Sequence, residues 1–275
     1  MSRVLTYLYV PGDVPERFDK ALTSGADAVV LDLEDAVRID RKDYARDTVA
    51  RWIAGLAPGP IEVWVRVNPG ALQEKDIRAV AHPRLTGLWM PKVGGARDVE
   101  QVDAILAMSS CPDAFVSPLI ETAAGVFAAR EIALAPRVRM LQIGEVDLAA
   151  DLGVDVSKDG AALLFPRSQV VAASAAAGIE PPLAAVSRNF RDRDAFEADT
   201  RFLASLGFAG RACIHPAQLE PARKAFTPPA TDLGAARAVL AALDAAESGV
   251  AVDYEGFLID EAVARRARRI IERAS

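Results

Sequence analysis

The feature that most constrains the fold is a repeated alternation of short apolar runs with helix-length segments. The first run, residues 5–10, is β-branched and aromatic, ends at Pro11-Gly12, and is followed by helical spacing over residues 15–22. Strands separated by helix-length segments pair in parallel. Seven further strand-like runs continue the pattern, with the seventh of the eight the weakest: 28–35, 61–68, 85–93, 114–122, 138–147, 182–190 and 208–216.

Eight β-α units predict an α/β chain, a (β/α)8 TIM barrel with a C-terminal helical extension. A doubly wound sheet of eight strands is the competing architecture. We expect the barrel to occupy residues 1–228 and the extension residues 229–275. In the extension an Ala-rich helix over 232–247 is followed by a turn near Gly249 and a basic terminal helix. It is a candidate lid or subunit-contact arm, or a helix that covers the barrel exterior.

Composition narrows the class of protein. The chain has 275 residues, of which 51% are hydrophobic, enough for one large core. Its net charge of −6 argues against nucleic acid and anionic membranes as partners. We find no leader at the first residues and no apolar stretch of the ~18 residues that span a bilayer, so we expect a cytoplasmic protein. Cys111 and Cys213 lie beside apolar residues and are expected to be buried, reduced thiols.

Polar residues at the ends of the predicted strands are the candidates for chemistry, because the carboxyl ends of barrel strands face the active site. Several acids at one rim would repel each other unless a cation or a substrate compensates them. The residues that share this placement are Asp32, Glu34, Asp35, Arg66, Asn68, Lys92, Glu121, Asp147 and His215.

Glu121 and Asp147 follow neighbouring runs and are predicted to bind Mg2+, which prefers oxygen ligands. Alternatively, they are acids favoured by helix N-termini. Arg66 suits bidentate capture of a substrate carboxylate, or else neutralises the acidic LDLED segment. Lys92 is expected to form an ion pair at the rim rather than a Schiff base. His215 is expected to be a hydrogen-bonding residue of the last loop.

Eight motifs, in seven segments, resemble in their order the citrate lyase β-chain and malyl-CoA lyase family, which is related to the HpcH/HpaI aldolases. The resemblance covers nearly the whole chain and has β-α spacing throughout. The segments are VPGDVPERFDKALTSGADAVVLDLEDAV, VRVN, MPK, ETAAG, GEVDLAADLG, GFAGRACIHPAQ and GFLIDEA, with the first containing two motifs.

The resemblance implies that Glu121 and Asp147 bind Mg2+, which a 2-oxo acid such as glyoxylate or oxaloacetate chelates. It implies that Arg66 holds and polarises this substrate. It also implies that Asp260, in GFLIDEA, moves a proton in the active site of a neighbouring subunit. Arg17 and Lys20 match part of a site for coenzyme A (CoA) phosphates. Glu34, Asp35 and Lys92 are further candidates for substrate binding at the same rim.

Four positions depart from the family's pattern. Relatives often have Arg at Val14, Glu at Val146, Asp at Ala184 and Pro at Ala262. Val14 removes one cation from the expected phosphate site, and Val146 replaces a carboxylate beside a metal ligand. These departures put the use of CoA in question.

The leading functional prediction is a Mg2+-dependent carbon–carbon lyase that cleaves or forms a hydroxyacyl-CoA, such as a citryl-CoA- or malyl-CoA-like thioester. The alternatives are a CoA-independent, Mg2+-dependent aldolase on hydroxy-oxo acids and a non-catalytic subunit like that of citrate lyase. The resemblance also implies a homo-oligomer, a trimer or a hexamer, whose partners are small molecules.

Overall fold

The computed structural model describes residues 3–156, 160–246, 249–253 and 256–274. Its contacts divide the chain into two compact units, one formed by Val4–Ala222 and the other by Arg3 together with residues 223–274. The domain boundary expected after residue 228 stays a prediction.

Seven parallel strands form the sheet of the larger unit, in the order β6-β5-β4-β3-β2-β1-β7. Each strand except β7 pairs with the strand before or after it in sequence, and β7 returns to pair with β1. The strands are β1 Thr6–Pro11, β2 Ala28–Asp32, β3 Glu62–Arg66, β4 Gly87–Met90, β5 Phe115–Ile120, β6 Gln142–Ile143 and β7 Arg211–Cys213.

Leu183 and Ala184 close the gap between β6 and β7. Leu183 bridges to Gln142 and Ala184 bridges to Arg211, both in parallel. Leu183 N–H donates to the carbonyl of Leu141 at 2.8 Å, and Ala184 N–H donates to that of Gly210 at 2.9 Å. This two-residue bridge stands where the weakest run, 182–190, predicted a strand. The (β/α)8 barrel is therefore confirmed, and the doubly wound sheet is wrong.

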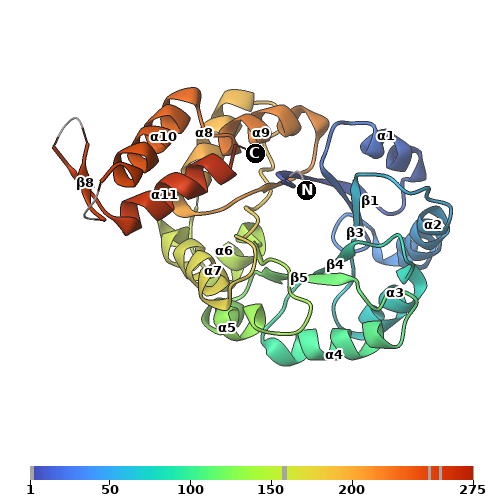
Figure 1. Cartoon of the computed structure of the whole chain (residues 1–275). Helices are drawn as coiled ribbons and strands as arrows, with labels where there is room; N and C mark the ends of the chain where they lie inside the picture. Colours follow the sequence, from blue (N-terminus) through green and yellow to red (C-terminus); the bar gives the residue numbers. More distant parts are fainter. Residues whose placement is uncertain (1–2, 157–159, 247–248, 254–255, 275) are drawn as a thin grey trace. The chain divides into compact units, whose positions relative to one another are not determined.

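Helices alternate with the strands and lie outside them, as Figure 1 shows for α2 to α5. The sequence did not predict α6, which begins inside the run expected to be a strand over 138–147. The helices of this unit are α1 Phe18–Leu22, α2 Lys42–Ala54, α3 Gln73–Val80, α4 Ala96–Ala107, α5 Ala123–Ala133, α6 Glu145–Leu152, α7 Leu164–Ala177, α8 Arg193–Leu206 and the first half of α9 Leu219–Phe226. Short 3-10 turns lie at Pro15–Arg17, Ile39–Arg41, Gly70–Leu72, Ala161–Leu163 and Pro216–Gln218.

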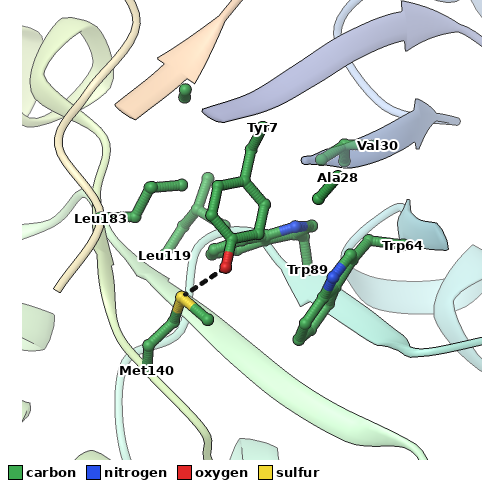
Figure 2. Packing of buried hydrophobic residues seen from close by; sticks show 9 residues of the cluster. Tyr7, Ala28, Val30, Trp64, Trp89, Leu119, Met140 and Leu183 are labelled. Atoms are coloured by element: carbon green, nitrogen blue, oxygen red, sulfur yellow. Dashed lines mark hydrogen bonds between the residues drawn. The ribbon is translucent and has the colours of Figure 1, made fainter. Parts of the chain in front are cut away.

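Large aromatic side chains fill the barrel interior (Figure 2). The rings of Tyr7 and Trp89 meet edge to face, with centroids 5.8 Å apart, and Trp64 lies 5.4 Å from Trp89. Gly87 is required here, because a Cβ at this position would overlap the Trp64 ring and approach the Phe115 carbonyl to 2.6 Å. Because side chains fill the barrel interior, the active site is expected at the carboxyl ends of the strands.

The smaller unit contains α10 (Ala230–Asp244), the antiparallel pair β8 (Ala251–Val252) and β9 (Leu258–Ile259), and α11 (Glu261–Glu272). The Ala-rich helix expected over 232–247 corresponds to α10, and the end of that range, 247, lies outside the described residues. Among the helices that the structure describes, none is both long enough and apolar enough to cross a membrane.

Candidate active site

A cross-strand ion pair organises the carboxyl ends of β2 and β3. The sheet register places Asp32 directly opposite Arg66. Arg66 Nε donates to Asp32 Oδ1 at 2.7 Å and Arg66 Nη2 donates to Oδ2 at 2.6 Å, a bidentate contact. Asp32 also accepts from the backbone N–H groups of Glu34 and Ala36, so it fixes the loop that follows β2.

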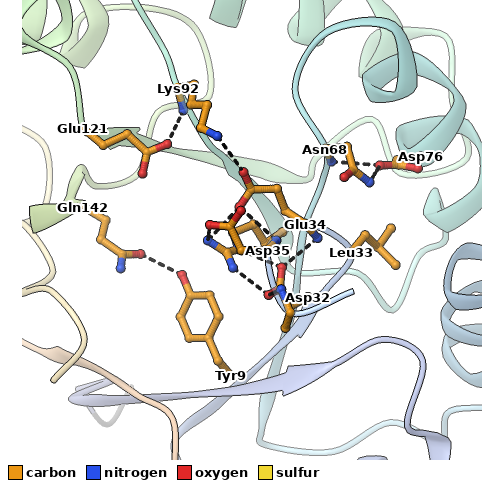
Figure 3. A network of polar contacts seen from close by, with 12 residues as sticks. Tyr9, Asp32, Leu33, Glu34, Asp35, Asn68, Asp76, Lys92, Glu121 and Gln142 are labelled. Atoms are coloured by element: carbon orange, nitrogen blue, oxygen red, sulfur yellow. Dashed lines mark hydrogen bonds and ion pairs between the residues drawn. The ribbon is translucent and has the colours of Figure 1, made fainter. Parts of the chain in front are cut away.

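Glu34 and Lys92 extend this pair towards β5. Arg66 Nη1 lies 2.9 Å from Glu34 Oε2, and Lys92 Nζ lies 3.4 Å from Glu34 Oε1. The backbone N–H of Lys92 donates to Glu121 Oε1 at 2.6 Å, so Lys92 contacts both acids (Figure 3). Lys92 adopts a left-handed backbone conformation, with φ of 56°, which a lysine rarely adopts. Asp35 is more exposed and lies 3.8 Å from Arg66.

Charge compensation keeps both cations protonated. Burial alone would lower the pKa of Arg66, but Asp32 outweighs it and raises that pKa. Burial likewise opposes the charge of Lys92, and Glu34 raises its pKa above the usual value. A protonated Lys92 is a poor nucleophile, which agrees with the ion-pair interpretation and opposes a Schiff base. Burial raises the pKa of the Glu34 carboxyl.

Glu121 and Asp147 each stand at the start of a helix. Glu121 follows β5 and precedes Thr122, whose hydroxyl accepts from the Gly125 N–H to cap α5. Asp147 lies in the first turn of α6. The alternative interpretation of helix-terminal acids therefore describes their location correctly, although it does not account for the burial of Glu121, which is 3% exposed.

The electrostatics of Glu121 favour a cation beside it. Burial, together with the nearby carboxylates of Asp147 and Glu34, raises the pKa of Glu121 to about 7, even though it accepts a hydrogen bond from Lys92. A cation between Glu121 and Asp147 would offset the burial and the repulsion. Gly144 shapes this position, because a Cβ there would overlap Glu121 Oε2 and lie 2.7 Å from Glu121 Cβ.

The ligand set fits Mg2+ better than a structural metal. Within the described ranges, no three or more His, Cys, Asp or Glu side chains form a group that could hold a metal ion. Mg2+ is commonly held by one or two carboxylates and completes its shell with waters and substrate oxygens. The donor set of Glu121 and Asp147 is therefore of the kind that this ion uses.

A cavity of about 720 Å³ opens at this end of the barrel. Its lining includes Asp32, Asp35, Arg66, Glu121 and Asp147. Such a volume accepts a ligand far larger than a 2-oxo acid.

Three cationic side chains also line the cavity: Arg17, Lys20 and Arg188. In the part of the chain that the structure describes, none of the three has an ion-pair partner. They are therefore available to an anionic ligand. Glu34 and Lys92 were expected to bind substrate, but they are not among the described residues that line the cavity. Glu34 instead forms an ion pair with Arg66, and the Lys92 N–H donates a hydrogen bond to Glu121.

The structure corrects the placement of Asn68. Its backbone N–H and its Nδ2 both donate to Asp76 Oδ2, at 2.8 and 2.7 Å, in a buried network that also includes Arg46. Asp76 of α3 holds Asn68 in place (Figure 3), and Asn68 is not among the described residues that line the cavity, although its strand-end position predicted that it would be. His215 does line the cavity, and its Nδ1 accepts from the Ala217 N–H at 3.1 Å, as expected of a loop residue.

Sequence reasoning missed several residues of the cavity lining, among them Arg188, Tyr9 and Gln142. Tyr9 donates from its hydroxyl to Gln142 Oε1 at 2.9 Å, and the Arg66 guanidinium lies 5.4 Å from the Tyr9 ring. Burial raises the pKa of Tyr9, so it stays a neutral donor. Gln142 could have been found, because it is the polar residue in the apolar run MLQIG. Cys111 and Cys213 are both buried, as expected.

Asp260 belongs to the smaller unit. It caps α11, with its Oδ1 accepting from the Val263 N–H at 3.0 Å. Its predicted part in proton transfer stays a prediction.

Comparison with known proteins agrees with this geometry. Residues 5–216 match the family described as HpcH/HpaI aldolase/citrate lyase. The chain belongs to this family. A citrate lyase subunit beta-like protein of Deinococcus radiodurans is 37% identical, with 96% of this chain and 95% of that protein covered. An L-malyl-CoA/beta-methylmalyl-CoA lyase of Cereibacter sphaeroides is 34% identical, with 97% and 93% covered.

Among solved structures, CitE from Mycobacterium tuberculosis is similar over 98% of this chain and 97% of its own, with 35% identity and a TM-score of 0.83. That structure is a complex with magnesium, acetoacetate and coenzyme A. The predicted family resemblance is confirmed, and family members named in this way are lyases.

Proposed function

We propose that this protein is a Mg2+-dependent carbon–carbon lyase that acts on a hydroxyacyl-CoA thioester. The observation that carries the proposal is the placement of Glu121, Asp147 and Arg66 in one large cavity, together with three cationic side chains that have no ion-pair partner among the described residues. The family relationship supports it, since a relative is named a malyl-CoA lyase and CitE was solved with magnesium and coenzyme A.

Glu121 and Asp147 would hold the metal through their carboxylates. Bound there, Mg2+ would supply Lewis acidity to the oxygens of a 2-oxo acid. In the cleavage direction the hydroxyl of the thioester loses its proton and becomes the carbonyl of the oxo acid. The electron pair of the broken carbon–carbon bond passes to the thioester enolate, which then takes a proton on carbon.

Arg66 is placed to stabilise the charge on oxygen. A guanidinium has five N–H donors. Asp32 and Glu34 engage all three of its nitrogens, which leaves about two N–H groups for a substrate carboxylate or oxyanion. The ion pairs fix the guanidinium before substrate arrives, which lowers the cost of reorganisation during the reaction.

Arg17, Lys20 and Arg188 would receive the phosphates of CoA, because cationic side chains without ion-pair partners favour polyanions. This favours the CoA-dependent lyase over the CoA-independent aldolase, even though Val14 and Val146 depart from the family's pattern. Val146 lines the cavity and is 49% exposed. Asp260 is the proposed proton-transfer residue. Assembly into a homo-oligomer and the cytoplasmic location stay predictions from the sequence.

The proposal is tested by incubating the protein with acetyl-CoA, Mg2+ and either glyoxylate or oxaloacetate, and following products by mass spectrometry. We expect a malyl-CoA- or citryl-CoA-like adduct that requires Mg2+ and is lost in Glu121→Gln. Release of free CoA without an adduct would indicate hydrolysis and contradict the lyase proposal. Consumption of hydroxy-oxo acids without any acyl-CoA would indicate the CoA-independent aldolase.

A further inference from the structure

A second ion pair, which is partly buried, lies beside the proposed metal ligands. Glu145 is the first residue of α6, two positions before Asp147, and both line the cavity. Arg167, from α7, donates from Nε to Glu145 Oε1 at 2.7 Å and from Nη2 to Oε2 at 2.8 Å. The Arg167 side chain is only 7% exposed. It is absent from the cavity lining in the described part of the chain, so direct substrate contact does not explain its burial.

The surroundings hold the Arg167 guanidinium in one place. Gly160 has a left-handed φ of +68°, and a Cβ there would lie 3.2 Å from Arg167 Nη1, so the chain passes close to the guanidinium. The centroid of the Phe202 ring of α8 lies 5.9 Å from Arg167 Cζ. Three segments of the barrel thus converge on this side chain. A bidentate pair in such a setting restricts the orientation of both partners.

Helix α6 needs an external restraint at its first turn. Its N-cap is Gly144, which has no side chain to cap the helix, and Gly144 cannot be replaced without overlap with Glu121. The usual means of fixing a helix start is therefore missing at the helix that carries Asp147. The Glu145–Arg167 pair supplies a fixed contact one residue into the helix.

We propose that Arg167 is a positioning residue for the metal site. Its bidentate ion pair with Glu145 fixes the first turn of α6, and this in turn fixes the direction in which the Asp147 carboxylate points. This inference rests on the proposed metal site at Glu121 and Asp147. Arg167 acts through Glu145 and Asp147 and does not itself contact metal or substrate.

Net charge and positioning predict opposite effects, which makes the proposal testable. Removing the Arg167 charge leaves the site more negative, so simple electrostatics predicts tighter Mg2+ binding in Arg167→Met. Positioning predicts weaker binding. In Arg167→Lys the charge is kept and the bidentate grip is lost, so electrostatics predicts no change and positioning again predicts weaker binding.

The experiment is calorimetric titration of Mg2+ into metal-free protein, with the thermal unfolding midpoint measured for each variant. We expect Arg167→Lys and Arg167→Met to weaken Mg2+ binding by about tenfold or more, as changes behind metal ligands do. The double variant Arg167→Met with Glu145→Gln has the wild-type net charge. The Mg2+ affinity of this double variant should stay below that of the wild type if positioning is the cause, and it should equal that of the wild type if charge is the cause.

Arg139→Met is the matched control. Arg139 forms a similar half-buried pair with Glu62, at 2.7 Å, but Glu62 begins β3 and so lies at the opposite end of the barrel from Arg66. We expect this control to lose thermal stability and to keep its Mg2+ affinity. If Arg167→Met does not fold, Arg167→Lys decides. Wild-type affinity in Arg167→Lys overturns the inference. No Mg2+ binding by the wild type overturns the proposed metal site, and the inference with it.

Discussion

Glu121 is the residue whose protonation should control the site. Its pKa is raised to about 7 by burial and by the nearby carboxylates, so the neutral form predominates at lower pH in the metal-free protein. Mg2+ needs the ionised carboxylate and competes with the proton.

Mg2+ affinity should therefore rise with pH and level off above about 7. Between pH 8 and pH 6 the ionised fraction of a group with this pKa falls about tenfold, and the association constant should fall by a similar factor. Calorimetric titration across this range measures it. In Glu121→Gln the pH dependence should disappear together with most of the affinity. A flat profile in the wild type would mean that Glu121 does not bind the metal.

Arg66 should matter for both turnover and folding. The structure shows that Arg66 also neutralises Asp32 and Glu34, which are 1% and 4% exposed. An uncharged replacement removes the ion pair of the buried Asp32 and leaves Glu34 with Lys92 alone. Folding should therefore suffer in Arg66→Met.

Arg66→Lys keeps the charge and separates the two effects. We expect the Arg66→Lys variant to fold and its kcat to be about 10²-fold lower, because a lysine ammonium cannot form the bidentate contact with Asp32 and bind the substrate at the same time. Steady-state kinetics alongside the unfolding midpoint provide the test. Wild-type turnover in Arg66→Lys would show that the guanidinium does not stabilise the reaction.

At the scale of elements, strand order and most helices could be predicted because apolar runs and helix-length segments are local signals. Two features could not. Leu183–Ala184 bridges the barrel with two residues, and its pairing depends on Gln142 and Arg211 from distant parts of the chain. The start of α6 at Glu145 was also missed, because an apolar run continues directly into a helix and no capping side chain marks the change.

The start of α6 is also where a small substitution should have a large effect. A Cβ at Gly144 would overlap Glu121 Oε2, so Gly144→Ala should displace that carboxylate and weaken Mg2+ binding by about tenfold or more. The matched control is Gly95→Ala, since Gly95 is the N-cap of α4 and a Cβ there meets nothing within 4 Å. Equal Mg2+ affinity in the two variants would argue against the close contact between Gly144 and the Glu121 side chain.

The difference between local sequence signals and contacts from distant parts of the chain also explains which site residues could be predicted. Arg66 ends β3, Glu121 directly follows β5, and Asp147 follows β6 by four residues in the first turn of α6, so the sequence pattern alone places them at the same end of the barrel. Tyr9 and Arg167 were not predictable, since one lies inside an apolar strand and the other on an outer helix. Their roles depend on partners, Gln142 and Glu145, that only the folded barrel brings to them.

For the whole molecule, the prediction to test is that Asp260 acts in a neighbouring subunit. Asp260→Asn is a mild change, because Asn caps a helix nearly as well as Asp, so α11 should be preserved. Activity should fall sharply at an unchanged unfolding midpoint.

Mixing subunits then locates the second chain. If each site combines Glu121 of one subunit with Asp260 of another, co-assembled Glu121→Gln and Asp260→Asn chains should recover activity in about a quarter of sites. Neither variant alone should be active. No recovery in verified mixed oligomers would place both residues in the same chain, and an active Asp260→Asn variant would remove Asp260 from the mechanism.

The most direct test of the central claim is calorimetric titration of acetyl-CoA into the protein, with and without Mg2+ and glyoxylate or oxaloacetate, in the wild type and in Asp147→Ala. We predict acetyl-CoA binding that tightens when Mg2+ and the oxo acid are present, and that loses this dependence in Asp147→Ala. Mg2+-dependent binding of the oxo acid with no binding of acetyl-CoA would contradict a CoA-thioester lyase.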